Sequence, residues 1–178
     1  KILVERKDEF LGISNILVVD AYFSKEKYVN AVCEQVGMEM ICRLRTDANL
    51  KYLYNGIQKG GKGRPKKYEG KIGLNNIDRR KIIFVMEDEE MAIRSARVYS
   101  VGLKREIRLV YVDFKNKKGQ VVTTKLFYST NVNRDPQQVV KYYKARFQME
   151  FIFRDAKQFA GLNTCESRQK ERLHFHHN

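Results

Sequence analysis

Residues 15–20, with the sequence Asn-Ile-Leu-Val-Val-Asp, form an unbroken apolar run that ends in an acid. Such a run is typical of a strand that is buried on both faces, as in a parallel sheet. Residues 25–36 follow with apolar side chains at the i, i+3, i+4 and i+7 spacing of one helix face. Ser24 is the predicted N-cap of this helix, and Gly37 is its predicted stop. Residues 38–44 predict a second strand.

Together these segments predict a βαβ unit, in which Asp20 lies at the carboxyl end of the first strand. Ligands of open α/β sheets bind at that edge of the sheet. Asp20 is therefore the first candidate functional residue.

The composition supports a globular domain with a polyanionic partner. The chain has 178 residues, of which 43% are hydrophobic, enough for one domain of ordinary size with an inserted module. Its 35 Lys and Arg residues exceed its 21 Asp and Glu residues, and the formal net charge is +14. An excess of this size favours nucleic acid, the commonest polyanion. A basic solvated surface with no partner is the alternative.

The three cysteines, Cys33, Cys42 and Cys165, are far apart and form no Cys-x-x-Cys pair. We therefore expect neither a zinc site nor a disulfide framework, but buried thiols in a reducing compartment. No apolar run reaches the length of about 18 residues that a membrane span needs, and no signal peptide is visible. Because the sequence opens on Lys1 rather than Met, we expect it to be an excerpt of a longer protein.

A strongly basic segment follows the βαβ unit. Residues 59–81 contain nine Lys or Arg and two acids. Glycines and Pro65 interrupt this segment, which predicts an exposed loop. Residues 62–65 (Lys-Gly-Arg-Pro) resemble the core of an AT-hook, an arm that binds the narrow minor groove of A·T-rich DNA; a general phosphate-binding loop is the alternative. The candidate DNA-binding residues of the segment are Arg64, Lys66 and Lys67.

A β-rich region comes next. Its strand-like runs are residues 82–86, 92–100, 105–114 and 120–128. Residues 116–119 (Asn-Lys-Lys-Gly) predict a hairpin connection between the last two runs. The acidic residues 87–90 predict a solvated turn rather than a metal site. We expect these strands to pair mainly with one another, as an insertion outside the core sheet.

A long helix is the last predicted element. Asp135 is a good N-cap, Pro136 suits the first helical position, and Gly161 suits the C-terminal stop. At about 100° per residue, two stripes of side chains run along this helix. The apolar stripe, predicted to be core, consists of Ala145, Met149, Ile152, Ala156 and Phe159.

The polar stripe of the helix consists of Tyr143, Arg146, Glu150 and Lys157. A carboxylate flanked by Arg and Lys suits a phosphodiester, because the acid binds a divalent cation and the two basic side chains pair with phosphate oxygens. Ordinary Arg–Glu–Lys ion pairs on a solvated helix face are the alternative.

The spacing of the polar stripe, with two, three and six residues between its members, resembles the Tyr-Arg-Glu-Lys signature of the insertion-sequence-four family of DDE transposases. Residues 18–23 (Val-Val-Asp-Ala-Tyr-Phe) are similar to that family's segment with the second catalytic Asp. Residues 63–68 and the closing residues 167–176 also resemble the family. The resemblance extends over most of the chain.

The resemblance implies an α/β, ribonuclease-H-like fold: a mixed sheet with helices, interrupted by a β-rich insertion. It implies three acids, Asp, Asp and Glu, that hold two Mg²⁺ or Mn²⁺ ions, with Asp20 as the second acid and Glu150 as the third. Arg146 and Lys157 would contact phosphates of the transposon end, and Tyr143 would help to position that DNA. The implied activity on double-stranded DNA is phosphodiester hydrolysis followed by strand transfer.

One departure from the family concerns the first catalytic Asp. The only Asp before Asp20 is Asp8, in a charged stretch that does not predict a strand. We therefore expect the N-terminal part of the fold to be missing, and the active site of this fragment to be incomplete and inactive alone.

The expected domains are residues 1–58 as the first part of the core, 59–130 as the basic loop and β-rich insertion, and 131–178 as the second part of the core with the catalytic helix. The rival interpretation is a non-enzymatic DNA-binding module derived from a transposase. The resemblance also implies a cytoplasmic, nucleoid-associated bacterial protein, and it allows a homodimer of the complete protein.

Overall fold

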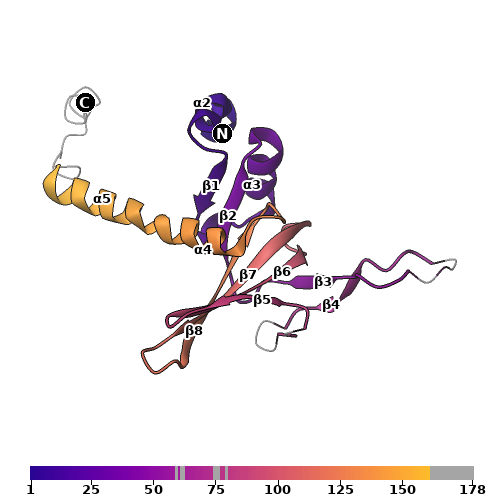
Figure 1. The fold of residues 1–178 in the computed structure, drawn as a ribbon. Helices are drawn as coiled ribbons and strands as arrows, with labels where there is room; N and C mark the ends of the chain where they lie inside the picture. The colour runs from indigo at the N-terminus through magenta and orange to yellow at the C-terminus, as the bar shows by residue number, and fades with distance from the viewer. Residues whose placement is uncertain (59, 61–62, 74–76, 79, 161–178) are drawn as a thin grey trace. The chain divides into compact units, whose positions relative to one another are not determined.

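The computed structural model describes residues 1–58, 60, 63–73, 77–78 and 80–160. The chain consists of two compact units, Lys1–Tyr143 and Lys144–Asn178. The first unit holds a mixed sheet with helices, and the second holds helix α5 (Phe147–Phe159) (Figure 1).

Eight strands form the sheet of the first unit, in the order β1-β2-β8-β7-β6-β3-β4, with β5 paired to β6. The strands are β1 (Ile16–Val19), β2 (Glu39–Leu44), β3 (Leu50–Leu53), β4 (Tyr68–Lys71), β5 (Ile83–Glu87), β6 (Met91–Ser100), β7 (Arg105–Lys115) and β8 (Val121–Ser129). Within the described ranges, β1 and β2 pair in parallel, and the other pairs are antiparallel. The predicted mixed α/β fold is therefore confirmed.

The βαβ unit predicted from the first apolar run is present. Strands β1 and β2 pair in parallel, in a register that places Val19 beside Cys42. Helix α3 (Glu26–Asn30) and a π-helical segment (Ala31–Val36) connect them. The segment ends at Gly37, whose φ of 86° is a left-handed conformation that glycine adopts at little cost.

Ser24 does not cap this helix, which corrects the prediction from the sequence. The N-cap position is Lys25, and it makes no side-chain cap hydrogen bond. The Ser24 hydroxyl instead forms a 3.0 Å hydrogen bond with the hydroxyl of Tyr128. Because Tyr128 is fully buried, its hydroxyl needs a partner inside the protein, and Ser24 supplies one.

Two short helices precede β1. They are α1 (Ile2–Glu5) and α2 (Lys7–Ile13). Leu3 and Phe10 of these helices pack against the hydrophobic cluster of the sheet. Asp8 therefore lies on a helix, which agrees with the expectation that its charged stretch is not a strand.

The four strands expected between residues 82 and 130 are present as β5 to β8, and the turn between β7 and β8 is where the sequence predicts it. The side-chain oxygen of Asn116 accepts hydrogen bonds from the backbone N–H groups of Lys118 and Gln120. Gly119 has a φ of 75°, which suits a glycine in a tight turn.

These strands pair mainly with one another, but they do not lie outside the core sheet, which corrects that part of the prediction. Strand β8 pairs with β2, and Ser129 lies opposite Ile41. The physical reason is the burial of β2. Met40, Ile41 and Cys42 are fully buried, so both hydrogen-bonding edges of the strand need partners, and β8 supplies the second edge.

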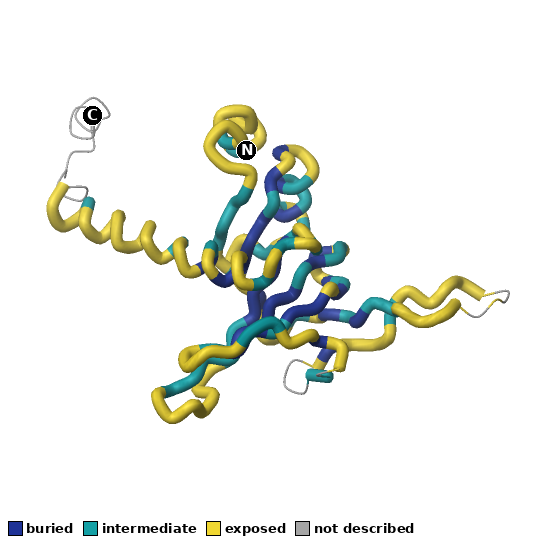
Figure 2. The backbone as a smooth tube through the Cα atoms, in the orientation of Figure 1, coloured by how far each residue is buried: buried dark blue, intermediate teal, exposed yellow. Residues whose placement is uncertain are grey.

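The basic segment 59–81 also differs from the exposed loop that the sequence predicts. Residues Tyr68–Lys71 form strand β4, which pairs with β3 and turns the described part of the segment into a hairpin arm. The arm projects from the sheet and is mostly exposed (Figures 1 and 2). Lys59, Lys62 and Arg79 lie outside the described residues.

Each face of the sheet carries a hydrophobic cluster, because successive side chains of a strand point to opposite faces. Met40 and Cys42 of β2 pack with the α3 side of the unit. Ile41 packs on the other face, beneath helix α4 (Pro136–Ala145). The α4 side chains in this second cluster are Val139, Val140 and Tyr143.

Helix α4 begins as predicted, with Pro136 in the first position and the Asp135 carboxylate accepting a hydrogen bond from the backbone N–H of Gln137. The single long helix of the prediction is, however, two helices. Helix α4 ends at Ala145, and α5 begins at Phe147. The predicted stop, Gly161, lies outside the described residues.

The apolar stripe predicted as core is exposed on α5, which corrects that expectation. No residue of α5 is buried, and Met149, Ile152 and Phe159 are 53%, 60% and 78% exposed. Periodicity predicts which side chains share a helix face. It does not predict whether a neighbouring element covers that face.

One partly buried ion pair ties the sheet to the segment before α4. Glu39, the first residue of β2, accepts hydrogen bonds from Arg134 at 2.9 Å and from the Ser129 hydroxyl at 2.7 Å. The side chains of Arg134 and Glu39 are only 21% and 10% exposed. Burial opposes ionisation of Glu39, but the bonds from Arg134 and Ser129 outweigh burial and hold the pKa of Glu39 below its ordinary value.

Glu39→Gln should lower the free energy of unfolding by about 1.5–3 kcal/mol, because it leaves a partly buried guanidinium without its carboxylate. Since the pKa of Glu39 is lowered in the folded state, its contribution is present above the ordinary pKa and is lost as pH falls through the lowered one. Urea unfolding between neutral and acidic pH measures both effects.

The matched control is Asp47→Asn, which breaks an exposed pair with Arg45 whose side chains are 75% and 70% exposed. It should cost less than about 1 kcal/mol. Equal losses from the two variants would show that the Glu39 pair has no special role.

Candidate active site

Asp20 lies where the sequence predicts it, directly after β1 and at the start of a 3₁₀ turn (Ala21–Phe23). It is exposed. Its Oδ1 atom accepts a 2.7 Å hydrogen bond from the backbone N–H of Ala21 and a 3.1 Å hydrogen bond from the Tyr143 hydroxyl. The carboxylate is therefore held in one orientation at the carboxyl end of the strand, the position at which open sheets bind ligands.

Tyr143 holds Asp20 from the last turns of α4. Only 5% of Tyr143 is exposed, and its ring lies 4.7 Å from that of Phe127 on β8. The packing of the two rings fixes the direction of the Tyr143 hydroxyl, and this hydroxyl donates the hydrogen bond to Asp20. The predicted contact of Tyr143 with DNA stays a prediction.

Cys42 lies behind Asp20, and its thiol donates a 3.2 Å hydrogen bond to the Asp20 backbone carbonyl. Burial is the main reason that the pKa of Cys42 rises to about 12, and the charge of Asp20 adds to it. The thiol therefore stays protonated and supports the strand end instead of acting as a nucleophile. Cys42 and the partly buried Cys33 are free thiols, as expected; Cys165 lies outside the described residues.

Glu150 lies in the second unit, on α5, with its side chain 59% exposed. Its Oε1 atom is 3.2 Å from Nη2 of Arg146, whose side chain is 21% exposed. Lys157, two turns further on, is exposed. The predicted proximity of Arg146 and Glu150 is therefore present, in the i, i+4 geometry that an ordinary surface ion pair also has.

The basic arm carries the other predicted DNA-binding residues. Arg64, Lys66 and Lys67 are all exposed. The Gln58 side chain donates to the carbonyl oxygen of Lys66 at 2.7 Å and accepts from its N–H at 3.0 Å, as a strand neighbour would. The Lys66 ammonium lies 4.8 Å from the centre of the Tyr54 ring. These contacts make the described part of the arm an ordered hairpin.

Residues 88–90 of the acidic run form the turn between β5 and β6, as predicted, and Glu87 is the last residue of β5. The Asp88 side chain accepts hydrogen bonds from the backbone N–H groups of Glu90 and Met91, and Glu87 pairs with Lys115. Among the described residues, no three His, Cys, Asp or Glu side chains cluster as a metal site would require. The three histidines of the sequence, His174, His176 and His177, lie outside those residues.

A family model described as the transposase DDE domain matches residues 8–176, nearly the whole chain. The chain therefore belongs to the transposase DDE domain family. Its mixed sheet with helices agrees with the ribonuclease-H-like fold of such domains. A search of the curated proteins found no match.

Family membership makes the protein a transposase domain, with DNA as its substrate class and divalent metals as the cofactors that such domains generally use. None of the helices in the described part of the chain is long and apolar enough to cross a membrane.

Sequence reasoning missed the hydrogen bond between Tyr143 and Asp20. The two residues are 123 positions apart. The helical spacing of the polar stripe predicts that Tyr143 faces the same way as Glu150, but no local pattern shows that its hydroxyl meets the end of β1. Only the packing of α4 on the sheet brings the two residues together.

Tyr143→Phe should lower the free energy of unfolding by about 0.5–1.5 kcal/mol, because it removes the hydroxyl and keeps the ring against Phe127. Tyr142→Phe is the matched control, since Tyr142 is the neighbouring, partly buried tyrosine of the same helix. Denaturant unfolding of both variants measures the difference. A Tyr143→Phe variant as stable as Tyr142→Phe would mean that the bond does not hold the strand end.

Proposed function

We propose that the protein takes part in phosphodiester hydrolysis and strand transfer at transposon ends, as the catalytic domain of a DDE transposase. The observation that carries the proposal is the exposed Asp20 carboxylate, held by Tyr143 at the carboxyl end of β1 in a chain of this family. The signature spacing of Tyr143, Arg146, Glu150 and Lys157 supports the insertion-sequence-four family within it.

Asp20 and Glu150 are the proposed ligands of two Mg²⁺ or Mn²⁺ ions. Both are exposed carboxylates, and these hard cations prefer oxygen ligands. Bound in such a site, the ions would activate a water or 3′-hydroxyl and stabilise the leaving oxygen. Asp20 and Glu150 would supply negatively charged oxygen ligands to these ions, and Tyr143 keeps the Asp20 carboxylate in place.

Arg146 and Lys157 are the proposed phosphate contacts at the transposon end, and Tyr143 is proposed to help to position that DNA. The guanidinium of Arg146 suits a phosphate because it can donate two parallel hydrogen bonds. Arg64, Lys66 and Lys67 on the arm are the proposed contacts along double-stranded DNA.

The remaining proposals concern the complete protein. Asp8, the only Asp before Asp20, lies on α2, so we propose that the first catalytic Asp lies in upstream sequence and that this fragment is inactive alone. Residues 1–58, 59–130 and 131–178 are proposed as three successive segments of the domain, and β8 of the middle segment pairs with β2 of the first. A homodimer and a cytoplasmic, nucleoid-associated location complete the proposal.

Replacing Arg64, Lys66 and Lys67 with Ala should weaken DNA binding and reduce its salt dependence. Each basic side chain that contacts a phosphate releases condensed counterions, so the slope of log affinity against log salt should fall by roughly 3 if all three contact phosphate. Fluorescence titration of a DNA duplex at several salt concentrations gives the slope. An unchanged slope would place the DNA contacts elsewhere.

Glu150→Gln and Asp20→Asn, each in the complete transposase, should abolish strand cleavage and preserve the fold and DNA affinity. The amide is isosteric with the acid but is a poor Mg²⁺ ligand. Arg146→Ala and Lys157→Ala should instead weaken binding of cleavage-site DNA.

Cleavage and duplex affinity, measured with Mg²⁺ for all four variants, decide between the enzyme and a non-enzymatic DNA-binding module. Near-normal cleavage by Glu150→Gln would end its catalytic assignment. Absence of cleavage in the unmodified complete protein, with DNA binding intact, would favour the binding module.

A further inference from the structure

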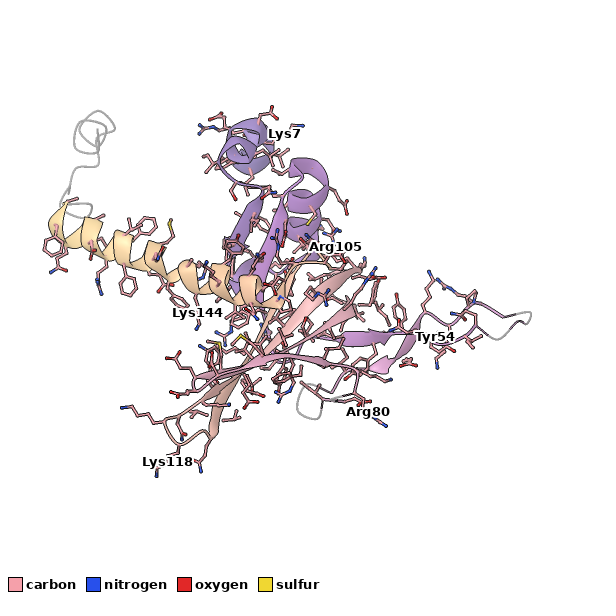
Figure 3. The ribbon with its side chains drawn as sticks, viewed as in Figure 1. Lys7, Tyr54, Arg80, Arg105, Lys118 and Lys144 are labelled. Carbon is pink, nitrogen blue, oxygen red and sulfur yellow. The ribbon has the colours of Figure 1, made fainter. Side chains whose placement is uncertain are left out.

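A groove of about 1010 Å³ lies where the β3–β4 arm joins the sheet. Four of its lining side chains are cations, Arg64, Lys66, Lys67 and Arg97. Glu106 is the one carboxylate among the described residues that line it, and it already pairs with Arg97 at 2.7 Å. The groove therefore has an excess of positive charge at the base of the arm, which carries Tyr54 (Figure 3).

The strand pair β6–β7 contributes Arg97 to the lining of the groove, and Arg108 lies beside Arg97, outside the lining residues. Arg97 of β6 lies opposite Arg108 of β7. Directly opposite residues of an antiparallel pair share one face of the sheet, and like charges in that position are destabilising. Glu106 offsets the charge of Arg97, so the unfavourable part of this arrangement falls on Arg108.

Arg108 is the more unusual of the two. Its Nε atom is buried and has no hydrogen-bond partner among the described residues. Burial is the main cause that lowers the pKa of Arg108, and the charge of Arg97 lowers it further. A buried donor without an acceptor costs free energy, which an arriving anion can recover.

The groove and the candidate active site share one face of the sheet. Val110, two residues after Arg108 on β7, belongs to the cluster beneath α4. Residues two apart in a strand point to the same face. Tyr143 of helix α4, on the same face, donates its hydrogen bond to Asp20. The groove and the end of β1 therefore lie on one face of the sheet, with α4 packed on the strands between them.

We propose that this groove binds the DNA backbone. Arg97 and Arg108 contact phosphates from the side of the sheet, while the arm covers the DNA strand from the other side. The inference rests on the proposed function, since it names the surface that holds the DNA substrate. It adds Arg97 and Arg108 to the DNA-binding residues, and it makes the arm one wall of a preformed site.

The lining chemistry favours a polyanion backbone over a small acidic ligand. The lining cations come from two separate elements, the arm and β6, and Arg108 of β7 lies next to Arg97, so together they suit a chain of charges better than a single anion. Tyr54, Tyr68 and Tyr99 also line the groove. Their rings and hydroxyls suit the sugars and phosphates of a nucleic-acid strand.

Arg108→Gln tests the proposal because it separates binding from stability. Removing one of two opposed charges should leave the melting temperature equal or higher. Affinity for a short fluorescent DNA duplex should fall at least about tenfold, the equivalent of one charge-assisted hydrogen bond. The salt slope should fall by about 1. Measurement in EDTA excludes cleavage, so a failure of the metal assignment at Asp20 or Glu150 leaves this test intact.

Lys118→Gln is the control, with the same change in net charge at the β7–β8 turn (Figure 3). Arg97→Gln is the second variant, for use if Arg108→Gln fails to fold, and it should also weaken DNA binding. Unchanged affinity in Arg108→Gln, or an equal loss in Lys118→Gln, would overturn the proposal.

Discussion

The hydrogen bonding of β2 along both of its edges is the constraint on which the rest of the first unit depends. β1 pairs with one edge in parallel, and β8 pairs with the other in the opposite direction. Since Met40, Ile41 and Cys42 are fully buried, neither edge can rely on water for its backbone partners. This requirement joins the first βαβ unit to the meander of β5 to β8, and the ion pair of Glu39 with Arg134 then fixes where α4 begins.

Asp20 gains its position from this arrangement. The strand end sets its backbone, Cys42 on the neighbouring strand supports its carbonyl oxygen, and Tyr143 on α4 orients its carboxylate. These contacts fix the Asp20 carboxylate through the strand end, the neighbouring strand and helix α4 together. A site of this kind is preorganised by packing, because Phe127 holds the Tyr143 ring in place.

Local patterns in the sequence predicted much of the fold. The unbroken apolar run predicted β1, the strand-like segments predicted β2 and β5 to β8, and Asp135 with Pro136 marked the start of α4. The long-range pairing of strands and side chains could not be predicted from these local patterns. No pattern in residues 126–129 distinguishes a strand that pairs with β2 from one that ends an insertion, and nothing near Ser24 indicates Tyr128, 104 positions away, as its partner. For the site, the motif identified Asp20 and Glu150 as candidates, but the hydrogen bond that orients Asp20 depends on tertiary packing alone.

The basic side chains of the protein differ in their effect on the stability of the fold, and this difference bears on their role. Arg94 pairs with Asp113 and Arg134 pairs with Glu39, so these arginines contribute to a stable sheet. Arg108 faces another arginine and buries a donor without an acceptor among the described residues. A fold optimised only for stability would place an uncharged residue there, since surplus charge in a confined position is unfavourable. The cost becomes useful once a polyanion is bound, because each phosphate then finds donors already desolvated and fixed in direction. The position of Arg108, on the α4 face of the sheet that also orients Asp20, links this unfavourably placed charge to the DNA that the family acts on.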